Sequence, residues 1–322
     1  MSKRLYPEMD PNIIEAIENG NLIIFIGAGI SALYGYPVWD ELARRLLNQC
    51  EKEKKITKSQ KEVLLSPSFS ALQRVTIACG KLGNENQGIE QVKHILSEEP
   101  RDEEDKISKY KRIEKIAGFL SRYRCPIITT NADLSLDKSK PFSKGLKLDS
   151  FKKWNPHYED LSLIHLHGSI NEPENMIFTS QAYAKAYRAE DKEFGEKLIK
   201  LLKGNKTILF MGYGLNEFEL IKYFISDISE IPNRFVLKGY LDKDRLVKEF
   251  DEEYYRTLGI TLIPYSMEKA GYDGLIKVLE KWDKTLTKET MVHKRLKQIV
   301  KDICNQEPNE ENITKLEGLL NE

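Results

Sequence analysis

Four short strings in this sequence combine glycine, hydroxyl, amide, carboxyl and imidazole groups at spacings that suit ligand binding and proton transfer. The first, Gly27-Ala28-Gly29-Ile30-Ser31-Ala32, satisfies the pattern G-x-G-x-x-G/A. Glycines so placed let the backbone turn sharply and approach a phosphate closely, and a following helix would supply N–H donors. The other three strings, in chain order, are Thr129-Thr130-Asn131-Ala132-Asp133, His165-Leu166-His167-Gly168-Ser169 and Phe210-Met211-Gly212-Tyr213-Gly214-Leu215.

Each string has both a chemical and an ordinary structural interpretation. His167 has a side chain whose usual pKa suits a general base near neutral pH, and a histidine at a strand end can equally be a packed structural residue. Asn131 offers both a donor and an acceptor, yet Asn131 and Asp133 can simply cap a turn. The glycine string at residue 27 can be a plain strand-to-helix turn, and Gly212-Tyr213-Gly214 a plain tight turn. His165 shares a strand face with His167, and we expect it to be structural.

The elements around these strings favour a common location for them. Short apolar runs with strand character precede each string, and helical patterns lie between several of them. Alternating strands and helices predict an α/β fold with a Rossmann-like, doubly wound parallel sheet, in which ligands bind at the carboxyl edge. Because each string follows a predicted strand, all four should meet at that edge. The predicted strands are 22–26, 125–130, 161–166, 175–178, 207–211, 234–240 and 259–264.

Helices dominate two further parts of the chain. Residues 54–123 contain no strong strand signal and are predicted to form a helical insert, with helices near 69–79, 89–96 and 107–120. Further helices are expected at 38–53, 181–202, 217–228 and 244–258. The C-terminal tail, 289–322, is expected to be helical, since Val292, Leu296, Ile299 and Ile303 form one apolar stripe. This tail could act as a linker or an oligomerisation element.

Composition narrows the classes of partner. The 322 residues contain 50 Lys and Arg and 50 Asp and Glu, so the net charge is zero and predicts neither nucleic-acid nor membrane-surface binding. No apolar run is long enough to span a bilayer, and the polar N-terminus lacks a secretion signal, so we expect a cytoplasmic protein. The four cysteines, Cys50, Cys79, Cys125 and Cys304, form no CxxC pair, which argues against disulfides and predicts no metal site.

A dehydrogenase would carry an acidic residue about 20 positions after the glycines, at the end of the second strand. Here that region, around Glu51, belongs to a predicted helix, and Pro37 interrupts the chain soon after the glycines. Both features argue against hydride transfer.

The wider pattern GAGIS-x3-G-x-P-x-W-x-x-L, with the other three strings, resembles the sirtuin-like domains of bacterial NAD-consuming defence proteins over roughly residues 12–282. GAGIS and the His-Gly pair are shared with sirtuin deacylases, whereas TTNAD and G-Y-G-L are more similar to the defence branch. The deacylases carry a zinc ribbon of two CxxC pairs, which this sequence lacks, and this argues against deacylation. The resemblance implies a sirtuin-like NAD-binding catalytic domain at 1–288.

The resemblance also implies a role for each motif residue. Asn131 and Asp133 would orient the ribose, the nicotinamide amide or the attacking water, with His167 as the general base. Gly27, Ala28, Gly29 and Ser31 would hold the phosphates. Pro37 and Trp39 would shape the loop over the nicotinamide ribose, Thr130 would line the NAD site, and Gly212, Tyr213 and Gly214 would hold the adenosine half.

The activity so implied is hydrolysis of NAD, as substrate, to nicotinamide and ADP-ribose, in antiphage defence by NAD depletion. The alternatives are a non-catalytic sensor of NAD or ADP-ribose and an NAD-dependent protein deacylase. Expected partners are NAD, further copies of the chain, and a phage-derived activator or a further C-terminal domain.

Overall fold

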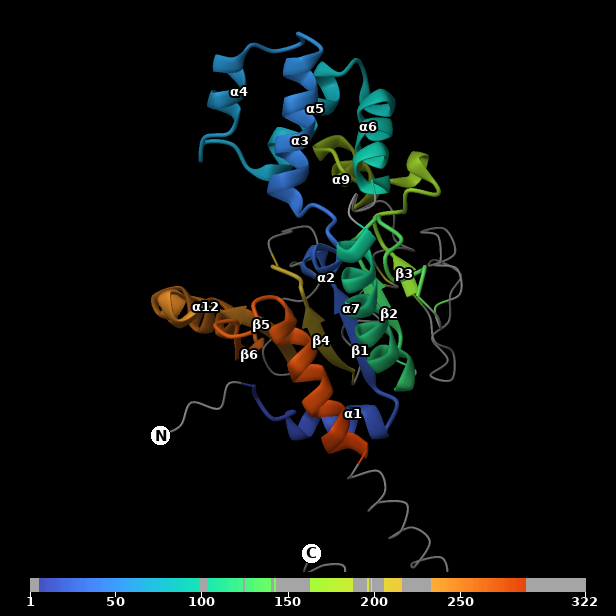
Figure 1. The fold of residues 1–322 in the computed structure, drawn as a ribbon, viewed down its shortest axis with the longest axis vertical. Helices are drawn as coiled ribbons and strands as arrows, with labels where there is room; N and C mark the ends of the chain where they lie inside the picture. The colour runs from blue at the N-terminus through green and yellow to red at the C-terminus, as the bar shows by residue number, and fades with distance from the viewer. Residues whose placement is uncertain are drawn as a thin grey trace, which may run out of the picture.

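The computed structural model describes residues 6–98, 103–123, 125–139, 163–187, 206–215 and 233–287, together with the single residues 142, 196 and 198. A six-stranded sheet lies at its centre in the order β3-β2-β1-β4-β5-β6, and every neighbouring pair is parallel (Figure 1). This confirms the predicted doubly wound α/β fold. The strands are β1 (Leu22–Ile26), β2 (Ile127–Thr129), β3 (Leu163–His165), β4 (Thr207–Met211), β5 (Arg234–Tyr240) and β6 (Thr261–Ser266).

The strand order reverses between β1 and β4. The chain first adds β2 and β3 on one side of β1, then returns to place β4 on its other side. Ile26 lies opposite both Thr129 and Met211, so three of the strands that precede predicted site strings end level with one another. The reversal point of such a sheet is where this class of fold binds ligands.

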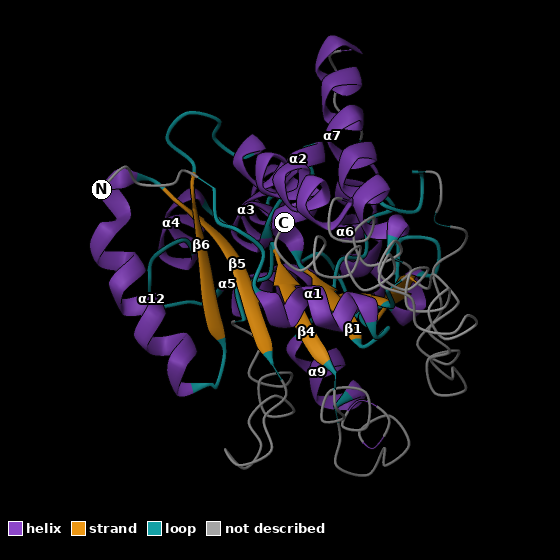
Figure 2. Cartoon of the chain, turned by 90° about the horizontal axis from the view of Figure 1, so that it is seen from below, coloured by secondary structure: helices purple, strands orange, loops and turns teal. Residues whose placement is uncertain are grey.

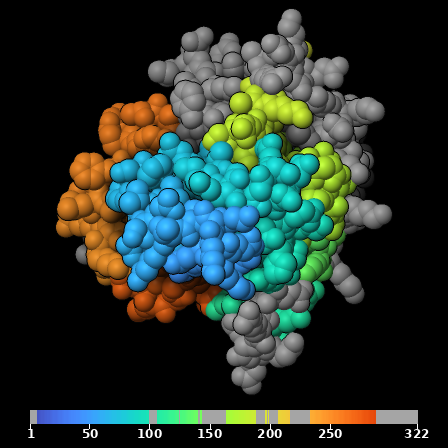
Figure 3. All heavy atoms as spheres, turned by 90° about the horizontal axis from the view of Figure 1, so that it is seen from above, coloured from blue at the N-terminus to red at the C-terminus, as the bar shows by residue number. Residues whose placement is uncertain are grey.

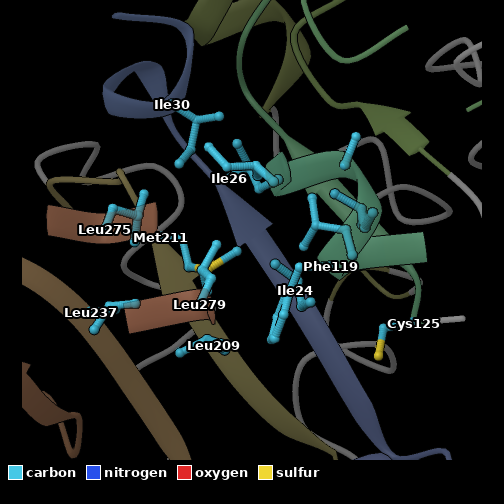
Figure 4. Packing of buried hydrophobic residues seen from close by; sticks show 14 of the residues in the cluster. Ile24, Ile26, Ile30, Phe119, Cys125, Leu209, Met211, Leu237, Leu275 and Leu279 are labelled. Atoms are coloured by element: carbon cyan, nitrogen blue, oxygen red, sulfur yellow. The ribbon is translucent and has the colours of Figure 1, made fainter. Parts of the chain in front are cut away.

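Helices cover both faces of the sheet, which explains why β1 is apolar along its whole length. Ile24 and Ile26 face a core shared with α1 (Pro11–Glu18), α2 (Ala28–Tyr34), α7 (Glu103–Arg122) and the helix over 273–287. Figure 4 shows Ile24 and Ile26 among Leu209, Met211 and other side chains of this core. Ile23 and Phe25 face the opposite core, with α9 (Ser180–Ala186) and Tyr255 of α12 (Arg245–Thr257).

A separate group of helices stands over the carboxyl edge of the sheet (Figure 1). It consists of α3 (Trp39–Lys52), α4 (Lys58–Leu64), α5 (Ala71–Lys81) and α6 (Glu85–Ser97). From above, their atoms, blue to cyan, fill the middle of the visible face (Figure 3). Their core also takes in Ala132, Met176 and Phe178 from the loops after β2 and β3. The helices between residues 54 and 123 therefore belong to two groups. Helices α4 to α6 pack with α3, whereas α7 packs on the sheet.

Two local predictions were wrong. Residues 175–178, predicted as a strand, form the end of a 3₁₀ turn (Pro173–Asn175) and an extended segment. The segment forms no strand: Met176 and Phe178 pack in the core of the helical group, and its contact with the loop after β3 is a single backbone bond from Ile177 N to the carbonyl oxygen of His167. No helix was predicted between the glycine turn and residue 38, but α2 begins at Ala28. The predicted helix at 217–228 and the tail at 289–322 lie outside the described residues.

Nowhere in the described ranges is a helix long and apolar enough to cross a membrane.

Candidate active site

The glycine turn after β1 lies against the segment after β4. Gly27 N donates to the carbonyl oxygen of Met211 at 3.1 Å, and Gly29 N donates to that of Gly212 at 2.8 Å. A Cβ atom on Gly27 would stand 2.5 Å from the Cα of Tyr213, and one on Gly29 would stand 2.9 Å from the Cα of Gly212. The turn therefore needs glycine because neighbouring backbone approaches closely. In this structure the close approach to Gly27 and Gly29 is made by the backbone of Gly212 and Tyr213.

The fourth string provides the other half of this contact. Gly212 has a φ of +62°, a left-handed conformation that favours glycine and turns the chain towards α2. The ring of Tyr213 packs in the core, 4.8 Å from the ring of Phe25 between centroids, and Gly214 is exposed. Of the three residues predicted to hold the adenosine half, Gly214 faces solvent, while the Tyr213 ring is committed to the core.

Asn131 joins the second string to the first. Its Nδ2 donates to the carbonyl oxygen of Gly27 at 2.9 Å and to Oγ of Ser31 at 2.7 Å. Ser31 is buried and Asn131 is half-buried. The two donors fix the amide orientation, and the Oδ1 atom makes no hydrogen bond to any residue that the structure describes. The structure thus leaves a fixed hydrogen-bond acceptor at the carboxyl edge of β1 and β2.

His165 contacts the backbone of Asn131 through its imidazole ring. Its Nδ1 lies 2.7 Å from the carbonyl oxygen of Asn131, and its Nε2 lies 3.2 and 3.3 Å from the two carboxylate oxygens of Asp137. A carbonyl and a carboxylate can only accept, so these contacts favour the protonated imidazole, in which both ring nitrogens donate. Burial alone would lower the pKa of His165, but hydrogen bonding and charge from Asp137, the Asn131 carbonyl and the charge of Asp133 raise it above its usual value. The contacts fit the structural role expected for His165.

Asp133 makes a local contact in this conformation. Oδ1 of the buried Asp133 accepts the backbone N–H of Ser135 at 3.0 Å, which is a turn-capping contact. Thr130 is buried at the end of β2. The neighbouring Thr129 donates its hydroxyl to the Ile26 carbonyl and accepts the Asn131 N–H, so it fixes the start of the loop.

His167 is sealed under α9. It is 0% exposed, its Nε2 lies 2.7 Å from the hydroxyl of Tyr187, and its Nδ1 lies 3.4 Å from the hydroxyl of Tyr183. Both tyrosine rings meet the imidazole edge-on. Burial lowers the pKa of His167 to about 3, so the ring is neutral in this state. Neither tyrosine is among the site residues expected from the sequence, although their i, i+4 spacing in a predicted helix indicated that they share a face.

Trp39 begins α3, and its ring lies 5.1 Å from that of Phe178 between centroids. It packs against both the sheet core and the helical-group core, so it joins the two. Pro37 is half-buried in the loop just before α3. Across the ranges described, no group of three or more His, Cys, Asp or Glu side chains is arranged to hold a metal ion.

Comparison with known proteins agrees with this architecture. Residues 126–263 match the family model of the SIR2-like domain, and the matched stretch spans β2 to β5 and three of the four strings. The chain is similar to NAD(+) hydrolase ThsA of Enterococcus faecium, with 29% identity over 259 residues, 75% of this chain and 48% of that protein. NAD(+) hydrolase ThsA of Acinetobacter baumannii (strain 532279) is 28% identical over 232 residues, 68% of this chain and 42% of that protein. The chain therefore spans about half the length of the curated relatives it matches.

Proposed function

We propose that this chain carries the catalytic domain of an enzyme that hydrolyses NAD to nicotinamide and ADP-ribose. The observation that carries the proposal is the Asn131 amide at the sheet edge, which Gly27 and Ser31 hold and whose Oδ1 bonds to none of the described residues. The similarity to two NAD(+) hydrolases, over 75% and 68% of this chain, supports the same activity.

Hydrolysis of NAD requires the protein to position the substrate and the attacking water and to supply one base. The bond between ribose C1′ and the nicotinamide nitrogen breaks, and nicotinamide leaves with the bonding electron pair as a neutral ring. The ribose carbon passes through an oxocarbenium-like state, as at other glycosidic centres. The oxygen of a water molecule then bonds to C1′ and releases one proton to a base.

Asn131 and His167 fit these two tasks. Oδ1 of Asn131 can accept a hydrogen bond from a ribose hydroxyl or from the attacking water. His167 is neutral and can accept the proton, but Tyr187 and Tyr183 cover it. Movement of α9 would admit water to His167, return its pKa towards the usual value of 6.5 and make it a stronger base.

The remaining NAD-contact assignments stay predictions. Gly27, Gly29 and Gly212 build the backbone contact that positions Asn131, so their part in NAD binding would be indirect in this conformation. Those still assigned to the NAD site on the resemblance are Ala28, Ser31, Pro37, Trp39, Thr130, Asp133, Tyr213 and Gly214.

The test is nicotinamide release from NAD, measured by chromatography. We expect Asn131→Ala and His167→Ala each to lower the rate by at least about a hundredfold, as loss of a positioned acid–base group does. The exposed residues Asn86 and His94 supply matched controls, and Asn86→Ala and His94→Ala should keep the wild-type rate. Thermal unfolding of each variant separates loss of chemistry from loss of fold.

Other outcomes would identify the alternatives. Tight NAD binding without release from the wild type would contradict hydrolysis and favour a sensor. Release that depends on an acylated peptide and yields acyl-ADP-ribose would favour a deacylase.

The biological role that we propose is antiphage defence by depletion of cellular NAD in the cytoplasm. A phage-derived activator, or a further domain C-terminal to these residues, would move Tyr183 and Tyr187 away from His167. Infected cells expressing the chain should lose NAD, whereas cells expressing His167→Ala should keep it. Unchanged NAD under every infection tested would contradict this role.

A further inference from the structure

Asn131 is held through its backbone as well as through its side chain. Its N–H donates to the hydroxyl oxygen of Thr129 at 3.0 Å, and its carbonyl oxygen lies 2.7 Å from Nδ1 of His165. The side-chain amide donates to Gly27 and Ser31. Since β2 ends at Thr129, these contacts fix Asn131 at a point where the sheet itself no longer does. The position of its Oδ1 atom therefore depends on each of them.

His165 is the member of this set that can carry a charge. It is buried at the end of β3, and its Nε2 lies 3.2 and 3.3 Å from the two carboxylate oxygens of the half-buried Asp137. A protonated ring can donate to the Asn131 carbonyl and to Asp137 at once, whereas a neutral ring has one N–H and must lose one of the two bonds. A charged donor also forms the stronger hydrogen bond. Protonation of His165 therefore determines how firmly the backbone of Asn131 is held.

The two histidines of the third string lie on opposite faces of the sheet. The side chain of His165 lies on the same face as that of Leu163, which packs in the core of α2 and α7. His167 follows in the turn beneath α9, where Tyr183 and Tyr187 face it. Helix α9 lies on one side of the sheet and α2 and α7 on the other (Figure 2). The expectation that both histidines share a strand face was wrong, because β3 ends at His165.

Their surroundings also favour opposite charge states. Burial alone would lower the pKa of His165. The carboxylates of Asp137 and Asp133, which face the ring from the loop after β2, and the carbonyl oxygen bonded to Nδ1 raise it above the usual value instead. Burial lowers the pKa of His167 to about 3. Two titratable groups whose surroundings separate their pKa values in this way suit different tasks.

We propose that His165 is a positioning residue for NAD hydrolysis: its protonated ring, held by Asp137, keeps Asn131 aligned with the substrate, and turnover falls when the ring loses its proton. This role rests on the proposed function and extends it, because His165 acts through Asn131 and not on the substrate. Hydrolysis then needs a charged His165 together with a neutral His167. The profile of kcat against pH should be bell-shaped, with an acid limb from His167 and an alkaline limb from His165.

Nicotinamide release from NAD, measured as kcat and KM across this pH range, tests the role. His165→Ala should lower kcat by about ten- to a hundredfold with little change in KM, because alignment matters most in the transition state. In His165→Asn the introduced amide can still donate to the Asn131 carbonyl but does not titrate, so this variant should keep more activity and lose the alkaline limb. Asp137→Asn should move that limb to lower pH. The exposed His94 supplies the control, His94→Asn, which should keep the wild-type profile.

A double substitution shows whether His165 acts through Asn131. In an Asn131→Ala background, His165→Ala should lower kcat by less than about twofold further, since the group that it positions is already gone. Full additivity of the two losses, or an alkaline limb that persists in His165→Asn, would overturn the proposal. No release from the wild type would refute the proposed function itself, whereas equal release by wild type and His165→Ala would refute the positioning role alone.

NMR of the full chain labelled with ¹⁵N-asparagine gives a readout that needs no turnover. The side-chain amide signal that is missing from Asn131→Ala identifies Asn131. That signal should shift with pH as His165 titrates in the wild type, and the shift should disappear in His165→Asn. A signal that does not follow the titration of His165 would overturn the proposal, whether or not NAD is hydrolysed.

Discussion

Replacing Asp137 with asparagine should reveal the buried charge on His165. The two side chains, His165 and Asp137, are 6% and 15% exposed, and Nε2 contacts both carboxylate oxygens at 3.2 and 3.3 Å. The amide that replaces the carboxylate can still accept one hydrogen bond, so Asp137→Asn removes the charge with little change in shape. A hydrogen bond between charged groups contributes about 1.5–3 kcal/mol, and we expect a loss of that size in the free energy of unfolding at acid pH.

The loss should depend on pH in a defined direction. Because the folded-state pKa of His165 is raised above the usual 6.5, its contribution is fully present below that value. It disappears as the pH rises through the raised folded-state pKa, since His165 is then neutral in both states. The wild type and Asp137→Asn should therefore differ most at about one pH unit below 6.5 and become nearly equal in alkaline solution.

Urea unfolding at acid, neutral and alkaline pH measures this difference. Glu90 forms an exposed ion pair with Lys93 at 3.6 Å, so Glu90→Gln is the control and should change stability by about 0.5 kcal/mol or less at every pH. With five histidines in the chain, NMR titration can follow His165 directly, and its pKa should fall in Asp137→Asn. An equal loss of stability at all pH values, or an unchanged pKa of His165, would refute the reasoning.

Three further predictions concern the neighbouring contacts. Gly27→Ala should lower the free energy of unfolding by about 1–3 kcal/mol, because its Cβ would overlap neighbouring backbone. Gly80→Ala is the control: its Cβ meets no atom within 4 Å, so the substitution should raise the free energy of unfolding by up to about 1 kcal/mol. Chemical denaturation measures both variants. Tyr187→Phe should lower the free energy of unfolding by about 0.5–1.5 kcal/mol, measured by thermal unfolding, because it removes the hydroxyl group that hydrogen-bonds to Nε2 of His167. Asn131→Asp should reduce NAD turnover at least as much as Asn131→Ala, because a carboxylate cannot donate to the Gly27 carbonyl; turnover near the wild-type rate would contradict the assignment.

Much of the fold could be predicted from the sequence because its signals are local. The strand β1 is a continuous apolar run that ends in glycine, and α3 and α12 have strong helical periodicity. Alternation of such elements limits the topology to a parallel sheet, whose carboxyl ends share one edge. That edge is where Asn131, the glycine turn and Gly212 meet. The one predicted strand that failed, at 175–178, had four residues and no partner to confirm it.

The contacts that decide how the site works join residues far apart in the chain. Asn131 bonds to Gly27 across 104 positions, and no local pattern indicates that Nδ2 of Asn131 is used in this contact while its Oδ1 bonds to none of the described residues. The burial of His167 depends on where α9 packs, and the sequence alone predicts a histidine with an ordinary pKa. Likewise, the sequence predicted a helix at 244–258, but only the packed structure shows which side of α12 faces out. Sequence determines each element and the residues at its end, whereas close approach, desolvation and exposure arise only when distant segments pack together.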